Sequence, residues 1–239
     1  MRLLDLTLDT PQENLALDEA LIEEAEAGRL DEDVLRLWET DRPTVVVGRS
    51  SRVQQEVDLV YCQAHDISVV RRCSGGAAVV IGPGCLLYSV MLSYRRWPQL
   101  RMVDAAHQFV LAKLSAATQH FHPQALMLGT SDLTLDGMKC SGNSLRCKRD
   151  HLLYHGTLLC RFELDLISKC LQMPPRQPKY RAGREHHAFV TNLDCSPAAA
   201  RRALIEQWQP AGALTSWPEK AVKQLVEARY SRREWNHRY

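Results

Sequence analysis

The residues best suited to chemistry lie in the stretch VVRRCSGGAAVV, a basic loop with two glycines inside a run of apolar residues. Arg71 and Arg72 precede Gly75 and Gly76. Glycine lets a backbone approach a ligand closely, because no side chain covers the N–H groups. Arginine adds forked donors that suit phosphate or carboxylate oxygens. The pattern indicates an anion site, and the alternative is a basic turn on the surface.

A second candidate is Lys139 in the stretch GMKCSGNS, just before Ser141 and Gly142. A lysine on a strand can point into a site and place one positive charge between a phosphate and a carboxyl oxygen. The alternative is a strand lysine in solvent. Taken alone, this segment favours the alternative.

Strands and turns must position both segments. Apolar residues on either side of the arginine pair predict a strand, a tight glycine-bearing turn and a returning strand. Gly82-Pro83-Gly84 breaks the pattern again before the strand resumes. Asp136-Gly137, between alternating residues, is the strongest hairpin signal in the chain and lies just before Lys139.

The rest of the chain alternates strands and helices without an internal repeat. Residues 1–10 alternate apolar and polar like a strand, and residues 11–28 have helical spacing. From Pro174 to Glu185 the composition changes to Pro, Arg, Lys and Gln, which predicts an exposed connection. Further strands are expected at 33–40, 43–50, 67–72 and within 131–166, and further helices at 57–66, 100–121, 196–209 and 218–239.

Composition restricts the class of protein. With 239 residues, 45% hydrophobic and 24% charged, the chain suits a globular α/β domain and excludes disordered and collagen-like classes. A net charge of +2 gives no reason to expect nucleic acid or a membrane surface as partner. The eight cysteines have irregular spacing and no Cys-x-x-Cys pair, so we interpret them as reduced thiols of a cytoplasmic protein without structural zinc.

The order and wording of several segments resemble the lipoate-protein ligase A family, within the biotin and lipoyl ligase superfamily. The stretches around the two candidate loops are the specific part of the resemblance, and the first helix and the final residues support it. The segments are NLALDEAL, VVVGRSSRVQQEVD, VVRRCSGGAAV, SDLTLDGMKCSGNS, HGTLL and ARYSRREWNHRY.

The resemblance implies an α/β (α+β) fold with a central mixed sheet flanked by helices. Residues 1–239 would form one catalytic domain, without the small accessory domain that many such ligases carry after it. Members of the family activate lipoate with ATP and magnesium to lipoyl-AMP, and then acylate a lysine of a carrier domain. Lipoate or octanoate is the expected substrate, because the long apolar strands suit a straight acyl chain better than the ureido ring of biotin.

Expected partners also follow from the resemblance. They are a lipoyl carrier domain, such as a 2-oxoacid dehydrogenase acyltransferase subunit or a glycine-cleavage carrier protein, and a separate accessory-domain subunit. The basic run PPRQPKYRAGRE suggests that the loop attracts an acidic carrier domain, and the alternative is a solvated loop. Neither nucleic acid nor a membrane is expected.

The resemblance also assigns roles to residues. Lys139 would be the catalytic residue, bridging the α-phosphate and the acyl carbonyl, and Asp132 would contact magnesium or the nucleotide. Three positions depart from the family pattern: Ala77 replaces a third glycine, Ser131 replaces an asparagine, and a histidine is absent around Val80 and Ile81. The remaining residues expected along the acyl and nucleotide channel are Arg71, Arg72, Ser74, Gly75, Gly76, Ala77, Ser141, Gly142, His155 and Gly156.

Two other functions remain open. Octanoyltransferases, a sister family, also carry a Gly-Pro-Gly segment and use a cysteine thioester instead of ATP. Cys73, Cys85, Cys140, Cys147 and Cys170 lie in or near the candidate segments, but none falls where that family would place its nucleophile, and a buried free cysteine is the commoner role. A non-catalytic subunit that holds a lipoyl group or a carrier domain is the third hypothesis.

Overall fold

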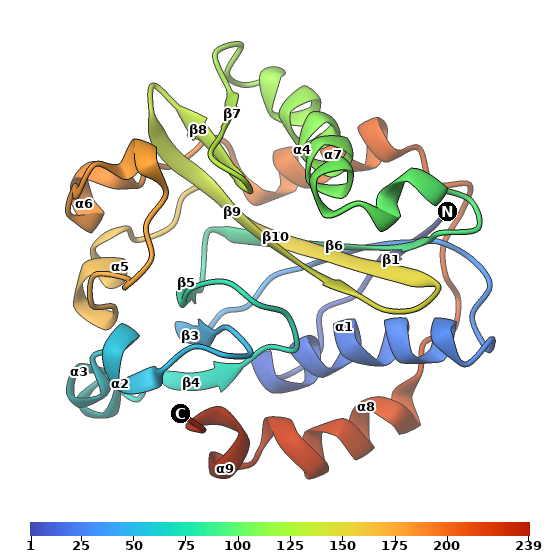
Figure 1. Cartoon of the computed structure of the whole chain (residues 1–239), viewed down its shortest axis with the longest axis horizontal. Helices are drawn as coiled ribbons and strands as arrows, with labels where there is room; N and C mark the ends of the chain where they lie inside the picture. The colour runs from blue at the N-terminus through green and yellow to red at the C-terminus, as the bar shows by residue number, and fades with distance from the viewer.

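A computed structural model describes residues 1–239 and contains a mixed seven-stranded sheet as its central layer (Figure 1). The sheet order is β1-β2-β6-β10-β9-β8-β7, in which only β1 and β2 run parallel. This confirms the predicted fold class. The strands are β1 (Arg2–Asp5), β2 (Val34–Trp38), β6 (Cys85–Ser93), β7 (Leu126–Leu128), β8 (Asp132–Leu135), β9 (Met138–Cys147) and β10 (His151–Leu159).

A smaller sheet of three strands holds the basic loop. Its order is β4 (Ser68–Arg71), β3 (Thr44–Val47) and β5 (Val79–Ile81). The predicted tight turn between β4 and β5 is wrong, because β3 lies between them. The loop crosses the end of β3 instead: the Arg72 N–H donates to the Val47 carbonyl and the Arg49 N–H donates to the Ser74 carbonyl.

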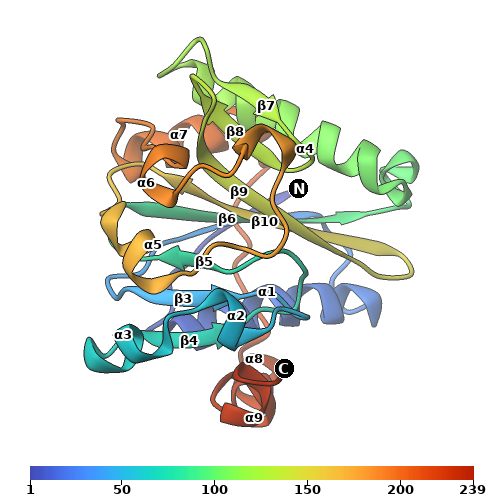
Figure 2. The same cartoon turned by 60° about the vertical axis from the view of Figure 1, so that its left-hand side comes forward.

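Helices cover both faces of the large sheet (Figures 1 and 2). Helix α1 (Pro11–Glu26) lies on the face that also carries the small sheet, and α4 (Val103–Gln119) and α7 (Pro197–Trp208) pack together on the other face. Thr10 starts α1 with a capping box, in which its hydroxyl accepts from the Glu13 N–H and the Glu13 carboxylate accepts from the Thr10 N–H.

The shorter helices connect these layers. Helix α8 and the π-helical turn η3 pack against α1, and η3 leads into α9 near the C-terminus. None of the helices combines the length and apolar character needed to cross a membrane. The remaining elements are α2 (Val53–Glu56), α3 (Leu59–Ala64), η1 (Pro98–Arg101), α5 (Asp165–Cys170), η2 (Lys179–Arg181), α6 (His186–Phe189), α8 (Glu219–Leu225), η3 (Val226–Tyr230) and α9 (Arg233–Asn236).

Two hydrophobic cores lie on opposite faces of the large sheet. On β6, Leu87 and Met91 belong to the core under α1, whereas Leu86, Tyr88 and Val90 belong to the core under α4 and α7. This alternation is the two-residue period of a strand whose faces are both covered. Polar side chains on the α1 face therefore have to find partners within the protein.

The β8–β9 hairpin sets the direction of Lys139. Asp136 and Gly137 form its two-residue turn with φ angles of +48° and +75°, as the Asp-Gly signal predicts. An irregularity between Leu133 and Thr134 shifts the register, so that Thr134 lies opposite Lys139. Such bulges re-aim side chains near sites.

Candidate active site

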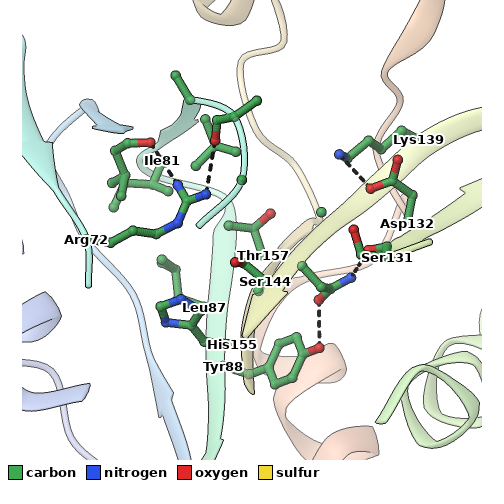
Figure 3. A pocket seen from close by; sticks show the side chains of 18 of the residues that line it. Arg72, Ile81, Leu87, Tyr88, Ser131, Asp132, Lys139, Ser144, His155 and Thr157 are labelled. Atoms are coloured by element: carbon green, nitrogen blue, oxygen red, sulfur yellow. Dashed lines mark hydrogen bonds and ion pairs between the residues drawn. The ribbon is translucent and has the colours of Figure 1, made fainter. Parts of the chain in front are cut away.

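A cavity of about 400 Å³ lies between the two sheets. Figure 3 shows Arg72 on one side of it and Lys139 with Asp132 on the other. The basic loop, β6, β9 and β10 form its walls, and Arg176, Gln177 and Pro178 of the loop after α5 complete them.

One part of the cavity is apolar. Leu15 of α1, Trp38 of β2, Val46 of β3, Ile81 of β5 and Leu87 of β6 line it. These side chains come from both sheets and the first helix, so the folded domain is needed to assemble them. Burying an alkyl chain against them is favourable by about 0.8 kcal/mol per CH₂ group.

Lys139 supplies a positive charge to the cavity. Its Nζ lies 2.7 Å from Asp132 Oδ1. The other oxygen, Asp132 Oδ2, accepts a hydrogen bond of 2.7 Å from the Tyr180 hydroxyl. The Lys139 side chain is 25% exposed and lines the cavity.

Tyr88, which Figure 3 labels, forms a second polar pair in the cavity wall with Asn143. The Tyr88 hydroxyl donates to Asn143 Oδ1 at 2.6 Å, and Asn143 Nδ2 donates to the Ser131 carbonyl at 2.8 Å. Gly156 leaves the space that Asn143 needs, because a Cβ at this position would lie 1.9 Å from Asn143 Oδ1.

A buried chain of hydrogen bonds runs under the basic loop. Ser74 Oγ lies 2.6 Å from His155 Nε2, and His155 Nδ1 lies 3.1 Å from Asp18 Oδ2. Arg36 then pairs with Asp18 Oδ1 at 2.6 Å. Burial raises the pKa of Asp18, but Arg36 and His155 outweigh it and hold that pKa below its ordinary value.

Ser74, His155 and Asp18 follow one another as in a nucleophilic triad, but the position of Ser74 indicates a structural role. Its side chain is buried and does not line the cavity. Its Oγ also accepts from Arg72 Nε at 3.1 Å. With Asp18 ionised, His155 Nδ1 carries a hydrogen that points at the Asp18 carboxylate, and Ser74 lies at the other ring nitrogen. This chain of hydrogen bonds therefore anchors the basic loop to α1 and β2.

Arg72 holds its own loop together. Its guanidinium donates to the carbonyl oxygens of Val46, Gly75 and Ala77. Burial lowers the pKa of Arg72 to about 10. Arg72 lines the cavity as predicted, but its donors are largely occupied by the loop, so it is less free to bind an anion than the sequence indicates.

Arg71 does not lie along the cavity, which corrects the predicted placement. Its buried guanidinium donates to carbonyl oxygens of the β3–α2 connection and of the C-terminal segment: Gly48, Arg49, Ser51, Trp235, Asn236 and Arg238. Consecutive residues of an extended strand point in opposite directions, so the two arginines cannot share one face.

The structure brings most of the predicted site residues together. Ser141 faces a smaller adjoining hollow of about 130 Å³, where Glu56, Gln172 and His186 also lie. Ser74, Gly75 and Arg71 line neither space. The predicted residues that line the main cavity are Arg72, Gly76, Ala77, Asp132, Lys139, Gly142, His155 and Gly156.

Sequence reasoning missed Asp18, Tyr88, Asn143 and Tyr180. Asp18 carries a detectable signal, because a charged residue within the apolar spacing of the first helix requires a buried partner. Asn143 lies inside the quoted CSGNS stretch. Tyr180 has no such signal, since it follows Lys139 by 41 residues within a segment that resembles an ordinary loop.

None of the eight cysteines lines the cavity or the adjoining hollow. Burial raises the pKa of Cys73 and Cys140, each to about 12. Cys147 is exposed, at the far end of β9 from Lys139. The thiols near the cavity are therefore protonated at neutral pH and lack the thiolate character of a nucleophile.

The resemblance also predicts magnesium at Asp132. Both oxygens of this carboxylate already have partners in Lys139 and Tyr180, and no group of three or more His, Cys, Asp or Glu side chains is arranged to hold a metal. The residues do not fit a magnesium site built by the protein itself, so no step is derived through the ion.

Comparison with known proteins places this geometry in a family. The family model of the lipoyl protein ligase A/B catalytic domain matches residues 10–208. A bi-partite lipoate protein ligase from Thermoplasma acidophilum, studied with its E2 lipoyl domain, superposes with a TM-score of 0.83 at 24% identity, covering 99% of this chain and 95% of that one. A lipoate-protein ligase A bound with ATP gives a TM-score of 0.78 at 24% identity, with 99% and 98% covered.

The fold is therefore that of lipoate-protein ligases. Lipoate-protein ligase A subunit 1 of Thermoplasma acidophilum is 28% identical over 251 residues, covering 97% of this chain and 95% of that protein. Octanoyltransferase LipM of Oceanobacillus iheyensis is 28% identical over 207 residues, covering 78% and 74%. Lipoate–protein ligase 1 of Staphylococcus aureus is 28% identical over 185 residues, covering 77% of this chain and about half, 53%, of that protein.

The chain belongs to the lipoyl protein ligase A/B catalytic-domain family, which includes lipoate ligases and octanoyltransferases.

Proposed function

We propose that this protein is an ATP-dependent lipoate-protein ligase that also accepts octanoate. It forms an acyl-AMP and passes the acyl group to a lysine of a lipoyl carrier domain. The observation that carries this proposal is the position of Lys139, whose amine lies in a cavity with an apolar part and a glycine-bearing loop, while no thiol lines that cavity.

The cavity suits the chemistry of activation. Forming an acyl-AMP brings a carboxylate against the α-phosphate, and the two anions repel each other. A fixed cation between them reduces that repulsion and stabilises the charge that develops during transfer. Lys139 can fill this role, because its amine is partly exposed and its only anionic partner is Asp132. Gly76 and Ala77 lie across the cavity, where backbone can approach the ligand.

The second substrate needs no separate base among the residues that line the cavity. Acyl-AMP has AMP as its leaving group, and the apolar walls exclude water around the acyl carbon. Asp18 and His155 lie in the cavity wall, but both are already paired within the buried Ser74–His155–Asp18 hydrogen-bond chain, so we give these residues a supporting role.

An octanoyltransferase is the second candidate, because LipM of Oceanobacillus iheyensis is as similar in identity as the ligases. A transferase of the cysteine type needs an accessible thiolate beside the acyl chain. Cys73 and Cys140 are the cysteines nearest in sequence to cavity residues, and both are buried. The ligase therefore fits the cavity better.

The direct test supplies purified protein with lipoate or octanoate, ATP and magnesium, and follows acyl-AMP and pyrophosphate by mass spectrometry. A carrier domain with an unmodified lysine is added in a second arm. Acyl-AMP followed by carrier acylation supports the ligase. Acyl transfer from octanoyl carrier protein without ATP would instead support the transferase. Binding of lipoate without either reaction, and without transfer from synthetic lipoyl-AMP, would support a non-catalytic subunit.

A separate accessory subunit is a further part of the proposal. It is supported by the bi-partite ligase of Thermoplasma acidophilum, whose subunit 1 matches nearly the whole of this chain. Residues 1–239 then act as one catalytic domain. Transfer from synthetic lipoyl-AMP by this chain alone, together with ATP-dependent activation only after a second subunit is added, is the expected result.

Substitution of Lys139 tests whether its charge is needed for activation. In Lys139→Ala, acyl-AMP formation should fall about 10²- to 10³-fold, the usual cost of removing one group that stabilises transition-state charge. Lys220→Ala, an exposed lysine on α8, is the matched control and should retain wild-type rates. Carrier acylation at the wild-type rate by Lys139→Ala would contradict the proposal.

A further inference from the structure

One carboxylate connects Lys139 to the loop between α5 and α6. Asp132 Oδ1 accepts from the Lys139 ammonium at 2.7 Å, and Asp132 Oδ2 accepts from the Tyr180 hydroxyl at 2.7 Å. The Asp132 side chain is only 9% exposed, so water has little access to either oxygen. Protein side chains therefore occupy both oxygens of the Asp132 carboxylate.

Tyr180 is itself held firmly. It lies on the η2 turn, its ring packs on Phe189 with the centroids 5.3 Å apart, and it also lies against Gly129. Arg184 fixes the same turn from the other side, because it donates to the Tyr180 carbonyl and to the Gly137 carbonyl in the β8–β9 hairpin. The phenol is thus a fixed donor.

The carboxyl torsion of an aspartate is broad, with no sharply preferred angle. A hydrogen bond to one of its oxygens removes this freedom and fixes where the other oxygen lies. Burial raises the pKa of Tyr180, so the phenol keeps its hydrogen and acts as a donor throughout the physiological range.

We propose that Tyr180 is a positioning residue for Lys139: its hydroxyl fixes the Asp132 carboxylate, which in turn holds the lysine amine at its place in the cavity. The inference rests on the proposed function for its kinetic consequence, but the positioning itself can be measured without any reaction. Tyr180 touches neither substrate nor reacting atoms in this assignment and acts through Asp132.

Tyr180→Phe is the appropriate variant, because the ring and its packing on Phe189 are kept and only the hydroxyl is lost. The expected result is a kcat about tenfold lower, with little change in the KM for the acyl acid. Tyr61→Phe, on α3 and outside the cavity, is the matched control and should match the wild type. Thermal unfolding of each variant verifies that the fold is retained.

A double-mutant cycle distinguishes positioning from loop packing. If Tyr180 acts through Asp132, Tyr180→Phe should have no further effect on kcat in an Asp132→Ala background. A merely structural role would make the two effects additive. Additive effects, or a wild-type kcat for Tyr180→Phe in an active enzyme, would overturn the proposal.

Chemical labelling gives a readout that does not depend on the ligase activity. The rate at which an N-hydroxysuccinimide acetate modifies Lys139 is measured by peptide mass spectrometry, with exposed Lys220 as the internal reference. We expect labelling of Lys139 to rise at least threefold in Tyr180→Phe, and not to rise beyond the Asp132→Ala level in the double variant. Unchanged labelling would overturn the positioning role, whether or not acyl-AMP is ever formed.

Discussion

The buried Asp18 carboxylate is the residue on which the loop depends most. It accepts from Arg36, Ser89 and His155, so three strands of the α1 face meet at one charge. Removing one partner of a buried ion pair leaves the other charge uncompensated, which typically costs about 3–5 kcal/mol. The structure therefore gives Asp18 a structural role rather than a place among reacting groups.

Asp18→Asn should lower the free energy of unfolding at pH 7 by about 3 kcal/mol, measured by urea denaturation. The pKa of Asp18 is lower in the folded than in the unfolded protein, so its contribution is complete above the unfolded pKa, near 3.8. That contribution is lost as pH falls through the lower folded value. The difference between wild type and Asp18→Asn should be constant from pH 5 to 7 and shrink below pH 3.8; a difference that grew with acid would contradict this assignment.

The close packing around Gly156 predicts that the cavity wall does not tolerate a larger side chain at this position. In Gly156→Ala, the new methyl group would meet Asn143 Oδ1 at 1.9 Å and the Gly142 carbonyl oxygen at 2.8 Å. We expect a loss of about 1–3 kcal/mol in unfolding free energy, the usual range for overpacking, together with loss of acyl-AMP formation. Gly75→Ala, where the methyl group meets nothing within 4 Å, is the stability control.

At the scale of the residue, site residues that belong to one local motif could be predicted from the sequence. Lys139, Asp132 and Gly142 lie in one continuous segment, and the structure places all three at the cavity. The prediction for the arginine pair holds for Arg72 but not for Arg71. Side chains alternate along an extended strand, so Arg71 contacts the C-terminal segment and Arg72 lines the cavity. Long-range partners such as Tyr180 depend on tertiary contacts that no local pattern contains.

At the scale of the element, the loop from Pro174 to Glu185 differs most from its prediction. Its composition predicts an exposed connection, yet Arg181 is buried, with its guanidinium 4.5 Å from the centre of the Phe189 ring. Arg176 and Lys179 remain exposed. Arg181 therefore has a structural role, whereas the exposed basic residues of this loop are available to a partner.

Charge reversal can separate these two roles. Lys179→Glu, which changes a residue that lines neither the cavity nor the adjoining hollow, should slow carrier acylation about threefold at low salt, because complementary charge mainly accelerates encounter, and salt should remove the difference. Arg181→Glu should instead lower stability at every salt concentration. Equal rates at low salt for the first variant and wild type would exclude attraction of an acidic carrier by this loop.

The order of the small sheet shows why strand existence is easier to predict than strand pairing. Apolar runs correctly indicate β3, β4 and β5. β3 lies between the other two because it pairs in parallel with β4 and in antiparallel with β5, and these strands are distant from it in sequence. Hydrophobic patterns specify which face of a strand is buried, but not which strand lies beside it.

At the scale of the whole molecule, Arg71 joins the β3–α2 connection, the end of β4 and the C-terminal segment. Its guanidinium reaches six carbonyl oxygens, and its own N–H and carbonyl pair with Asn236 and Trp235 side chains. No side chain other than that of arginine can supply this number of donors in one plane.

Arg71→Lys should therefore destabilise the fold although charge is conserved. A lysine has three donors on one nitrogen and would leave several buried carbonyls unpaired, at a cost of about 1–3 kcal/mol for each group left without a partner. We expect a loss of about 3 kcal/mol in the free energy of unfolding by urea. Arg52→Lys, an exposed arginine in the β3–α2 connection, is the control, and equal stability of both variants would contradict the role of Arg71.

The same contact has a consequence during protein synthesis. Arg71 is separated from Trp235 by 164 residues, a stretch that a ribosome adds in roughly 8–33 s at 5–20 residues per second. Until then, half of the acceptors of its guanidinium do not exist, and the strand that leads into the basic loop lacks one of its anchors. The strand β4 that leads into the basic loop is therefore fully anchored only after residues 235–238 have been synthesised.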